Sequence, residues 1–421
     1  MGGYGWAFNA GTSLRARLLN FVKKQGESLP LMSFGYMASL FRAQGHRVSY
    51  WDADSSGRSL PDGDMAFISS SMVDYRNELA WAKRFRDAGL KVGFIGIFAS
   101  VKPELFLPAC DFIIQGEPEE ACDRIAKGFE PSGVVPSTPV ADLDSLAVPD
   151  WEGFPYHRFS YLPVIKERPF FPVLSSRGCA FHCGYCPYTA FYTYRNRSVE
   201  NVINEISFLV RRYGMRGMLF RDPLFTGNKQ RAVSIAEEIL RNNIKLRWAC
   251  ETRMDLLDEE MLRLFYRAGC RVINVGVESS DPSLLTEVNR RRIAQDHQKM
   301  IVDAADRLGI RMTAFYVLGL PGENTQTLAG TIAYAKWLNT YVAQFFINTP
   351  FPGTPEYEKQ KDHLVETDWE RFDCYTPVLK YDNLTSAELL AWKEKAFVSY
   401  YFRPRYLWHY MKRTGRALVH G

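Results

Sequence analysis

From about residue 170 onward, short runs of β-branched and aromatic residues alternate with segments of helical periodicity, and this alternation restricts the possible folds. Between the first two runs, apolar residues from 199 to 213 recur on one helical face, with Ser198 placed to cap the helix and Gly214 to end it. Six such units with right-handed crossovers predict a parallel sheet curled into a partial (β/α)6 barrel, short of the eight strands that close a barrel. The predicted strands are residues 170–176, 217–222, 246–252, 271–277, 311–318 and 343–349.

A second series of strand-like runs lies upstream, and each run is nearly continuous in apolar residues, as in buried parallel strands. The runs are "HRVSYWDAD", "DMAFISSS", "KVGFIGIF" and "CDFIIQGEPE", with helices predicted at 32–44 and 75–88 and a short, glycine-rich candidate for a further first strand in "GWAFN". This pattern predicts a doubly wound, Rossmann-like α/β domain. Ligands of such domains bind at the carboxyl ends of the strands, where Ser69, Ser70, Gly96 and Gly116 lie.

The proline-rich stretch after this domain has no clear period and reads as a linker. The predicted layout is a Rossmann-like domain at 1–130, a linker at 131–168, the partial barrel at 169–350 and a helical, substrate-covering C-terminal region at 351–421. The end of that region, "AFVSYYFRPRYLWHYMKRTG", mixes aromatic and basic residues. A helix packed on the barrel is the favoured reading, and a helix at a membrane surface is the alternative.

Composition excludes several classes of function. The 421 residues carry 52 Lys and Arg against 47 Asp and Glu, and the two signs are interspersed, so no nucleic-acid footprint stands out. No run of about 18 apolar residues occurs, and the first residues do not resemble a secretory signal, so no transmembrane segment is expected. The eight cysteines are sparse and mostly lie in apolar segments, which favours a reducing compartment and a cytoplasmic protein.

Three cysteines, Cys179, Cys183 and Cys186, lie in the stretch "SSRGCAFHCGYCPY", directly after the first predicted barrel strand. A structural zinc site would normally need a fourth Cys or His ligand, and His182 is poorly placed beside Cys183 to bind the same ion. Thiolates also select iron–sulfur clusters, and three thiolates on a four-iron cluster leave one iron free. The pattern favours such a cluster as the metal site, with zinc as the alternative.

This spacing, with Tyr185 before the third cysteine, on the loop after strand one of a six-unit barrel, resembles the radical SAM superfamily. Other segments resemble the cobalamin (B12)-binding radical SAM class, in the same order along nearly the whole chain. They are "GYMASLFRAQGHRVSYWDAD", "GEPE", "LFRDPLFT", "CETRMDLLDEEMLRLFYRAGCRVINVGVESSD", "YVLGLPGE", "TPFPGTPEYE" and "YYFRPRYL". The resemblance implies an N-terminal B12-binding-type domain and a radical SAM barrel.

For the chemistry, the resemblance implies a 4Fe–4S cluster on the three cysteines, whose free iron binds S-adenosylmethionine (SAM). The reduced cluster then cleaves SAM to a 5′-deoxyadenosyl radical that takes hydrogen from a small-molecule substrate. A flavodoxin- or ferredoxin-type protein is the implied electron donor.

The resemblance also implies that Tyr185, Arg253 and Glu278 contact SAM, with Asp222 as a weaker candidate. Arg253 and Glu278 come just after the third and fourth predicted barrel strands, so both can reach the barrel mouth. A guanidinium fork suits the carboxylate of SAM, and a glutamate can accept hydrogen bonds from its ribose or amino group. A salt bridge to each other or to a neighbour is the alternative for both, and Asp222 before a proline can simply shape a turn.

The residues leave cobalamin binding and the reaction open. No Asp-x-His-x-x-Gly occurs, and "IGIFAS" stands where relatives commonly carry a Gly-Gly-x-His-like loop. With cobalamin, facing Ser69, Ser70, Gly96 and Gly116, the leading reading is methylation of an unactivated carbon of a specialised metabolite, sugar or lipid.

Without cobalamin, those four residues make tight turns, and the barrel could run dehydration, ring contraction, cyclisation or oxidation. The alternative from another functional class is a noncatalytic carrier of an iron–sulfur cluster or a corrinoid. Phe191, Tyr192 and Tyr194, after the cysteine loop, are candidates to line the substrate pocket.

Overall fold

The computed structural model describes residues 8–23, 27–52, 60–162, 164–408 and 410–411. The chain divides into two compact units. In their described parts, unit 1 comprises residues 28–52, 60–158 and 368–373, and unit 2 comprises residues 8–23, 27, 159–162, 164–367, 374–408 and 410–411.

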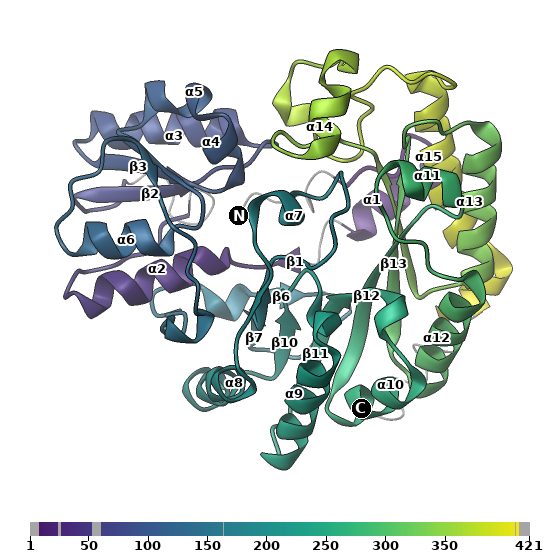
Figure 1. Cartoon of the computed structure of the whole chain (residues 1–421), viewed down its shortest axis with the longest axis horizontal. Coiled ribbons are helices and arrows are strands. Elements are labelled where there is room, and N and C mark those ends of the chain that lie inside the picture. Colours follow the sequence, from purple (N-terminus) through teal and green to yellow (C-terminus); the bar gives the residue numbers. More distant parts are fainter. Residues whose placement is uncertain (1–7, 24–26, 53–59, 163, 409, 412–421) are drawn as a thin grey trace. The chain divides into compact units, whose positions relative to one another are not determined.

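The main element of unit 2 is a six-stranded parallel sheet in the order β14-β13-β12-β11-β10-β7 (Figure 1). Its strands are β7 (Phe170–Val173), β10 (Gly217–Phe220), β11 (Arg247–Thr252), β12 (Cys270–Glu278), β13 (Arg311–Leu318) and β14 (Val342–Ile347). The crossover helices are α8 (Val199–Tyr213), α9 (Lys229–Arg241), α10 (Glu259–Arg267), α12 (Gln295–Leu308) and α13 (Thr325–Leu338). The six predicted barrel strands are confirmed, with ends shifted by a few residues, and so is the predicted helix at 199–213. Adjacent parallel strands place all their carboxyl ends at one edge.

Capping and burial explain why these segments form where the sequence predicts. Ser198 accepts a hydrogen bond from the backbone N–H of Asn201 at 3.1 Å at the start of α8, and Gly214 ends this helix in the left-handed region, with φ 66°. The strands are buried on both faces, and Phe220 and Trp248 pack edge to face at 5.4 Å in the centre of the sheet.

Shorter elements complete unit 2. They are α1 (Leu14–Lys23), β6 (Ser160–Tyr161), β8 (Ser176–Arg177), α7 (Pro187–Phe191), β9 (Arg195–Asn196), α11 (Pro282–Glu287), α14 (Pro355–Gln360) and α15 (Ser386–Tyr401). Helix α15 packs on the sheet: Phe397 meets Phe345 of β14 at 5.3 Å, and the Tyr401 hydroxyl donates to the carbonyl of Ala343 at 2.7 Å. This part of the C-terminal region is therefore a helix packed on the barrel, as the favoured prediction has it.

Unit 1 is built on a four-stranded parallel sheet in the order β2-β3-β4-β5, with helices over both faces (Figure 1). Its strands are β2 (Met65–Ser69), β3 (Lys91–Ile95), β4 (Phe112–Gln115) and β5 (Gly133–Pro136), and β1 (Glu27–Ser28) precedes them. Its helices are α2 (Met32–Ala43), α3 (Tyr75–Asp87), α4 (Ile97–Val101), α5 (Pro103–Phe106) and α6 (Glu119–Ala126). Helices α2 and α6 cover one face around Phe112, Ile114 and Val135. The predicted doubly wound pattern is present in this unit.

One strand prediction for the Rossmann-like domain is wrong, and a second lies mostly outside the described residues. "HRVSYWDAD" forms no strand over residues 46–52, and residues 53–54 lie outside the described part of the chain. Its aromatic side chains pack separately instead: Tyr50 stacks on Phe154 at 4.8 Å, and Trp51 meets Trp81 at 4.6 Å. The sheet takes β5 from the predicted linker. "GWAFN" shows no strand at residues 8–9, and its first three residues are not described.

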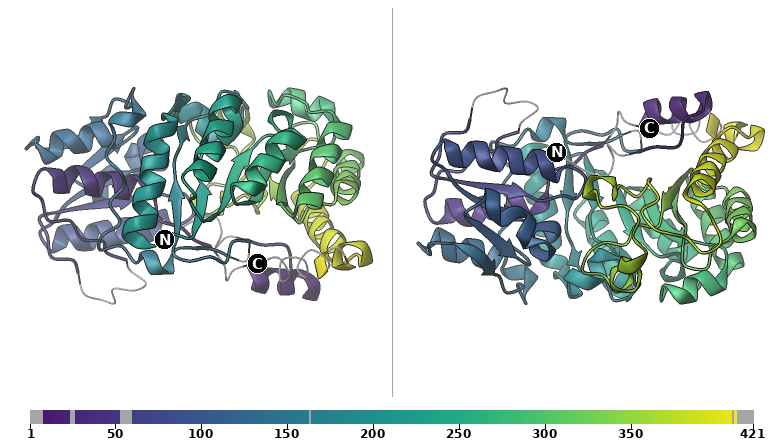
Figure 2. Two further views of the ribbon diagram at one scale, coloured as in Figure 1. Left: turned by 90° about the horizontal axis from the view of Figure 1, so that it is seen from below. Right: turned by 90° about the horizontal axis from the view of Figure 1, so that it is seen from above.

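Figure 2 gives two further views of both units. Within the described residues, no helix combines the length and the apolar character needed to cross a bilayer.

Candidate functional site

The three-cysteine loop lies between β8 and α7, at the carboxyl edge of the sheet in unit 2. Gly178 starts the loop with φ +71°, and a Cβ there would lie 2.6 Å from the carbonyl oxygens of Tyr192 and Thr193. Only glycine permits this close approach and this backbone conformation together. The loop ends at Pro187, the first residue of α7, where a missing N–H costs the helix nothing.

Hydrogen bonds from distant segments hold the cysteine loop in place. The N–H of Gly184 donates to the carbonyl of Val288 at 2.9 Å, and the Asn289 side chain donates to the carbonyl of His182 at 2.7 Å. The N–H of Glu356, at the start of α14, donates to the carbonyl of Gly184 at 3.0 Å. The loop is therefore fixed by the turn after α11 and by α14, which gives its three thiols a defined arrangement.

All three thiols are free, and each is at least partly buried. Burial raises the pKa of Cys186 to about 11, and burial with the nearby charge of Cys183 raises the pKa of Cys179. The thiols of Cys179 and Cys186 are therefore neutral unless a cation compensates them, as an iron cluster would. In the part of the chain that is described, no three His, Cys, Asp or Glu side chains stand in position to ligate a metal ion.

Arg290 lies beside one of these thiols. Its Nη1 lies 3.8 Å from Cys183 Sγ, and its Nη2 donates to the carbonyl of Gly276 at 2.7 Å and lies 3.2 Å from Glu278 Oε1. The Arg290 and Glu278 side chains are only 11% and 8% exposed. A buried guanidinium thus joins the cysteine loop to the end of β12.

The backbone of β12 turns Glu278 toward Arg290. A register shift against β13 lies between Gly276 and Glu278, and Glu278 adopts a left-handed conformation with φ 66°. A Cβ on Gly276 would lie 2.3 Å from Glu278 Oε1, so a side chain there would displace the carboxylate. Bulges and left-handed non-glycine residues concentrate at functional sites because they re-aim a side chain.

Arg253, directly after β11, is 4% exposed and has a guanidinium that is partly paired. Asp255 accepts from Nε at 2.9 Å and from Nη2 at 3.0 Å, and the guanidinium carbon lies 4.2 Å from the centroid of the Phe181 ring in the cysteine loop. Within the described residues, its Nη1 is a buried donor without a hydrogen-bond partner. Arg253 therefore forms a salt bridge with its neighbour Asp255, while its Nη1 stays available to donate to an anionic ligand.

Tyr185 packs against Leu284, Val288 and Leu320, in a small apolar cluster between the cysteine loop, α11 and the loop after β13. Burial raises the pKa of the Tyr185 phenol well above its ordinary value, so the phenol stays a neutral hydrogen-bond donor.

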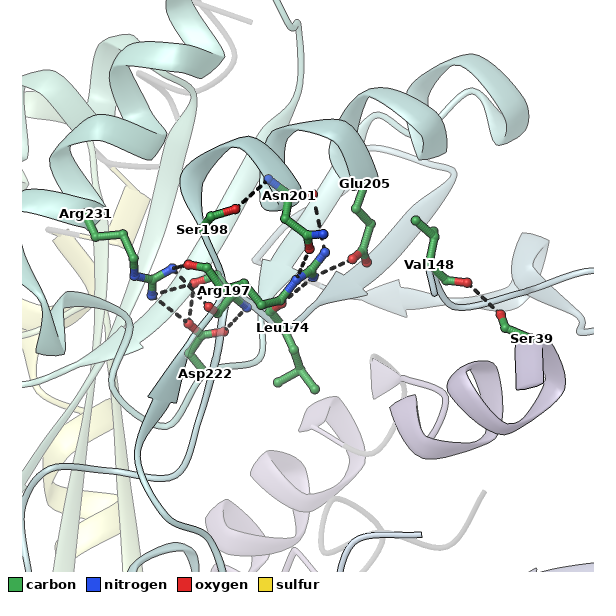
Figure 3. Close-up of polar contacts among 10 residues, drawn as sticks. Ser39, Val148, Leu174, Arg197, Ser198, Asn201, Glu205, Asp222 and Arg231 are labelled. Carbon is green, nitrogen blue, oxygen red and sulfur yellow. Dashed lines mark hydrogen bonds and ion pairs between the residues drawn. The ribbon is translucent and has the colours of Figure 1, made fainter. Parts of the chain in front are cut away.

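Asp222 lies in a buried polar network (Figure 3). It is 0% exposed, and its carboxylate accepts from the N–H of Ser175 at 2.7 Å, from Ser175 Oγ at 2.5 Å and from Ser176 Oγ at 2.7 Å. Arg231 lies 3.8 Å away and also donates to the Ser175 carbonyl. These contacts support Asp222 as a brace for the strand that leads into the cysteine loop, rather than as a cofactor contact.

A cavity of about 380 Å³ opens beside the cysteine loop. Its lining includes Cys179, His182, Thr189 and the three aromatic residues proposed from the sequence, Phe191, Tyr192 and Tyr194. Pockets of this size suit a small molecule, and the aromatic rings favour an apolar or planar one.

Hydrogen bonds connect the segments that follow the strands of unit 1. Ser70 Oγ accepts from the N–H of Ala99 at 2.9 Å, and Ser100 Oγ donates to the carbonyl of Gly96 at 2.8 Å. Ser100 Oγ also accepts from the N–H of Gly116 at 3.2 Å, and a Cβ on Gly96 would lie 3.0 Å from Ser70 Oγ. Ser69 ends β2 beside this group. These contacts account for Ser70 and both glycines without a ligand.

Sequence reasoning did not find Arg290, Asn289 or Val288. Arg290 opens a run of three arginines after α11, and such a run is usually a solvated face. The turn folds back to bond the cysteine loop, and no local pattern shows that contact.

Residues 173–335 match the model of the radical SAM superfamily. The chain is 28% identical to an uncharacterized methyltransferase of Pyrococcus horikoshii, over 91% of this chain and 90% of that protein. It is 29% identical to the anaerobic magnesium-protoporphyrin IX monomethyl ester cyclase of Rubrivivax gelatinosus, over 65% of this chain and 51% of the cyclase.

Among solved structures, the radical SAM methyltransferase TsrM of Kitasatospora setae, with cobalamin and a [4Fe–4S] cluster bound, is similar with a TM-score of 0.66 at 19% identity. The similarity covers 81% of this chain and 77% of TsrM, and it shows a shared fold.

Proposed function

The chain belongs to the radical SAM superfamily, and from this premise we propose that it is a methyltransferase that modifies an unactivated carbon of a small molecule. Membership makes the chain an enzyme whose cofactors are a [4Fe–4S] cluster and SAM. The observation that carries the proposal is a fixed loop of three free thiols, which borders a cavity of about 380 Å³ and two buried guanidinium groups.

We assign the cluster to Cys179, Cys183 and Cys186, because the set offers three thiolates and no fourth cysteine in the loop. When bound, such a cluster supplies the electron that splits SAM and so begins radical chemistry. A flavodoxin- or ferredoxin-type protein is the proposed electron source.

The surrounding residues bind and orient SAM in this proposal. The unpartnered Nη1 of Arg253 would pair with the SAM carboxylate, for which a buried guanidinium donor is suited. Glu278, held by Arg290, would accept from the amino group or the ribose, and the Tyr185 hydroxyl would donate a further hydrogen bond. Burial of these groups excludes water, which protects a radical from side reactions.

The cavity beside Cys179 is the proposed substrate site. Phe191, Tyr192 and Tyr194 would bury an apolar or planar part of the substrate against the cysteine loop. The similarity to a cyclase acting on a magnesium-protoporphyrin ester supports a large, apolar small molecule over a sugar.

Cobalamin is bound in TsrM, whose fold this chain shares. Ser70 accepts from the N–H of Ala99, and the Ser100 hydroxyl bonds both Gly96 and Gly116. These groups therefore form no free polar cradle for a corrin, and we assign none of the four strand-end residues to cobalamin. No step of the proposed reaction is assigned to cobalamin. Adding hydroxocobalamin to the assay described next measures whether methylation requires this cofactor.

The test is product analysis of anaerobically reconstituted protein with a strong reductant, SAM carrying a deuterated methyl group, and a small-molecule extract of producing cells. We expect 5′-deoxyadenosine, S-adenosylhomocysteine and a small molecule that has gained the labelled methyl group. The Cys183→Ala variant should form none of them.

Two other outcomes would contradict the proposal. Formation of 5′-deoxyadenosine without any methyl transfer would instead support cyclisation, oxidation or another non-methylating reaction. An intact cluster that never cleaves SAM would support a noncatalytic carrier.

A further inference from the structure

Helix α1 carries an exposed apolar stripe. Leu14, Leu18 and Phe21 are 84%, 53% and 66% exposed, and their i, i+4, i+7 spacing places them on one helical face. Ala16, on the opposite face, is 0% exposed. The helix thus packs on unit 2 by its small residue and presents its large apolar residues to the outside, the reverse of an ordinary surface helix.

A second exposed apolar group lies in the helical segment near the C-terminal end of the described chain. Leu407, Trp408 and Met411 are 49%, 57% and 65% exposed. Tyr406, between them and α15, is 6% exposed and donates to the carbonyl of Tyr341 at 2.8 Å, which anchors the segment. This segment, too, is held by one side and exposes large apolar side chains on another.

Contacts within unit 2 hold the two groups next to each other. Glu394 of α15 accepts from the N–H of Thr12 at 2.7 Å and from the N–H of Ser13 at 3.2 Å, just before α1. The Arg15 guanidinium lies 5.5 Å from the ring centroid of Phe402, just before the C-terminal segment. Both views of Figure 2 show α1, in purple, beside the yellow C-terminal segment. We call the two groups together the apolar–basic face.

The two segments that carry these groups are rich in basic residues, and the acidic side chain of Glu394, which accepts from the N–H groups of Thr12 and Ser13, lies beside them. Residues 12–24 contain Arg15, Arg17, Lys23 and Lys24 and no acidic residue. In the described part of this segment Arg405 is exposed, whereas Arg403 donates to Asn339 and to the carbonyls of Lys336 and Tyr400. The sequence after Met411 adds Lys412, Arg413 and Arg416, which lie outside the described residues, and residues 402–416 contain no acidic residue. The net charge of the whole chain is only +5, so positive charge is concentrated in these two segments.

We propose that the apolar–basic face docks on the surface of an anionic lipid bilayer. Leu, Phe, Trp and Met side chains insert at the boundary between headgroups and acyl chains, and flanking Arg and Lys side chains contact lipid phosphates. Each cation near an anionic membrane adds about 1 kcal/mol of attraction. Charge complementarity selects this occupant, since a protein partner would need a dense acidic patch of matching shape. The inference does not depend on the proposed reaction.

The test is flotation of the full-length protein with vesicles of equal parts phosphatidylglycerol and phosphatidylcholine, compared with phosphatidylcholine alone. The protein should float with the anionic vesicles, and raising the salt to about 1 M, where the Debye length is about 3 Å, should release most of it. Leu14→Gln/Leu18→Gln/Phe21→Gln should lose binding at least tenfold, and Arg15→Gln/Arg17→Gln, which removes two cations, should lose it roughly thirtyfold.

Matched controls alter equally exposed residues elsewhere on unit 2. Met300→Gln/Val365→Gln removes apolar residues that are 46% and 61% exposed, and Arg241→Gln/Arg263→Gln removes two exposed charges. Both should bind like the wild type, with circular dichroism checking that every variant is folded.

Absence of flotation with anionic vesicles would overturn the inference, as would equal binding to phosphatidylcholine alone. Self-association in sedimentation experiments, abolished by the α1 triple variant without any vesicle binding, would assign the face to a second copy and also overturn it. Because vesicle binding is measured without SAM or cluster, its failure is distinct from failure of the proposed reaction.

Discussion

Arg290 brings a full positive charge to the thiol that we assign to the cluster, with Nη1 3.8 Å from Cys183 Sγ. A buried cation stabilises the more negative, reduced state of a nearby cluster, because the low local dielectric strengthens the interaction. Arg290→Met is therefore predicted to shift the cluster midpoint potential to a more negative value, and Arg290→Lys should shift it less. A redox titration of the anaerobic protein, followed by EPR, measures the potential.

Arg292→Met is the matched control, since it removes an exposed arginine from the same run. A midpoint potential that is equal in Arg290→Met, Arg292→Met and the wild type would show that Arg290 has only a packing role.

Glu78 in unit 1 makes stability depend on pH. Its carboxyl group accepts from the N–H and the hydroxyl of Ser71, at 2.9 and 2.7 Å, and burial raises its pKa from 4.5 to about 8. A raised carboxyl pKa means that the folded state binds the proton more tightly, so stability should fall as pH rises from about 4.5 to about 8.

Glu78→Gln keeps the shape and the hydrogen bonds but cannot ionise. We expect it to melt like the wild type near pH 5 and to be more stable by about 2 kcal/mol at pH 9, less than the full shift implies because the side chain is only partly buried. Thermal melting across this range is the measurement. Parallel curves for the two proteins would contradict the assignment.

At the scale of elements, an ion-pair network ties α8 and α9 to the strand that leads into the cysteine loop. Arg197 pairs with Glu205 of α8 at 2.5 Å, with side chains 5% and 0% exposed, and donates to the Leu174 carbonyl at 2.7 Å. Figure 3 shows Arg197 between Glu205 and Leu174, with the Asp222 and Arg231 pair beside it.

Glu205→Gln removes the charge of a buried ion-pair partner of Arg197 and should destabilise unit 2 by roughly 3–5 kcal/mol. Glu200→Gln, an exposed change on the same helix, should be nearly neutral. Denaturant unfolding of both variants checks this. Equal midpoints would mean that the buried pair contributes little to stability.

Local periodicity and capping predict the elements of the barrel, because most of its strands are rich in apolar residues and most of its crossover helices have one apolar face. The same rules failed at residues 46–52, where Tyr50 and Trp51 are aromatic because they pack on Phe154 and Trp81, and not because they lie in a sheet. Strand β5 was missed because its "GVVP" resembles a loop, although proline is tolerated at a sheet edge.

The candidate site was predictable only in its local part. The cysteine spacing is visible in the sequence, but the bulge that turns Glu278 toward Arg290 depends on pairing with β13. Asp222 looked like a ligand because it ends a strand, and its carboxylate is saturated by Ser175 and Ser176, from the strand and turn beside it. Contacts between segments that are distant in the sequence determine the environments of Glu278 and Asp222, and the local sequence pattern does not predict such contacts.

At the scale of the whole molecule, the proposed cluster and SAM site lie in unit 2. This unit contains the three cysteines, Arg253, Glu278, Arg290 and the cavity beside Cys179. Cluster assembly should therefore require each of the three cysteines.

The most direct test is Mössbauer spectroscopy of anaerobic protein reconstituted with isotopically enriched iron, recorded before and after SAM is added. The account predicts a [4Fe–4S] spectrum in which about a quarter of the iron signal changes on SAM binding, as for a cluster with one iron open to a ligand. A spectrum that SAM leaves unchanged, or a Cys183→Ala variant that assembles the same SAM-responsive cluster, would contradict it.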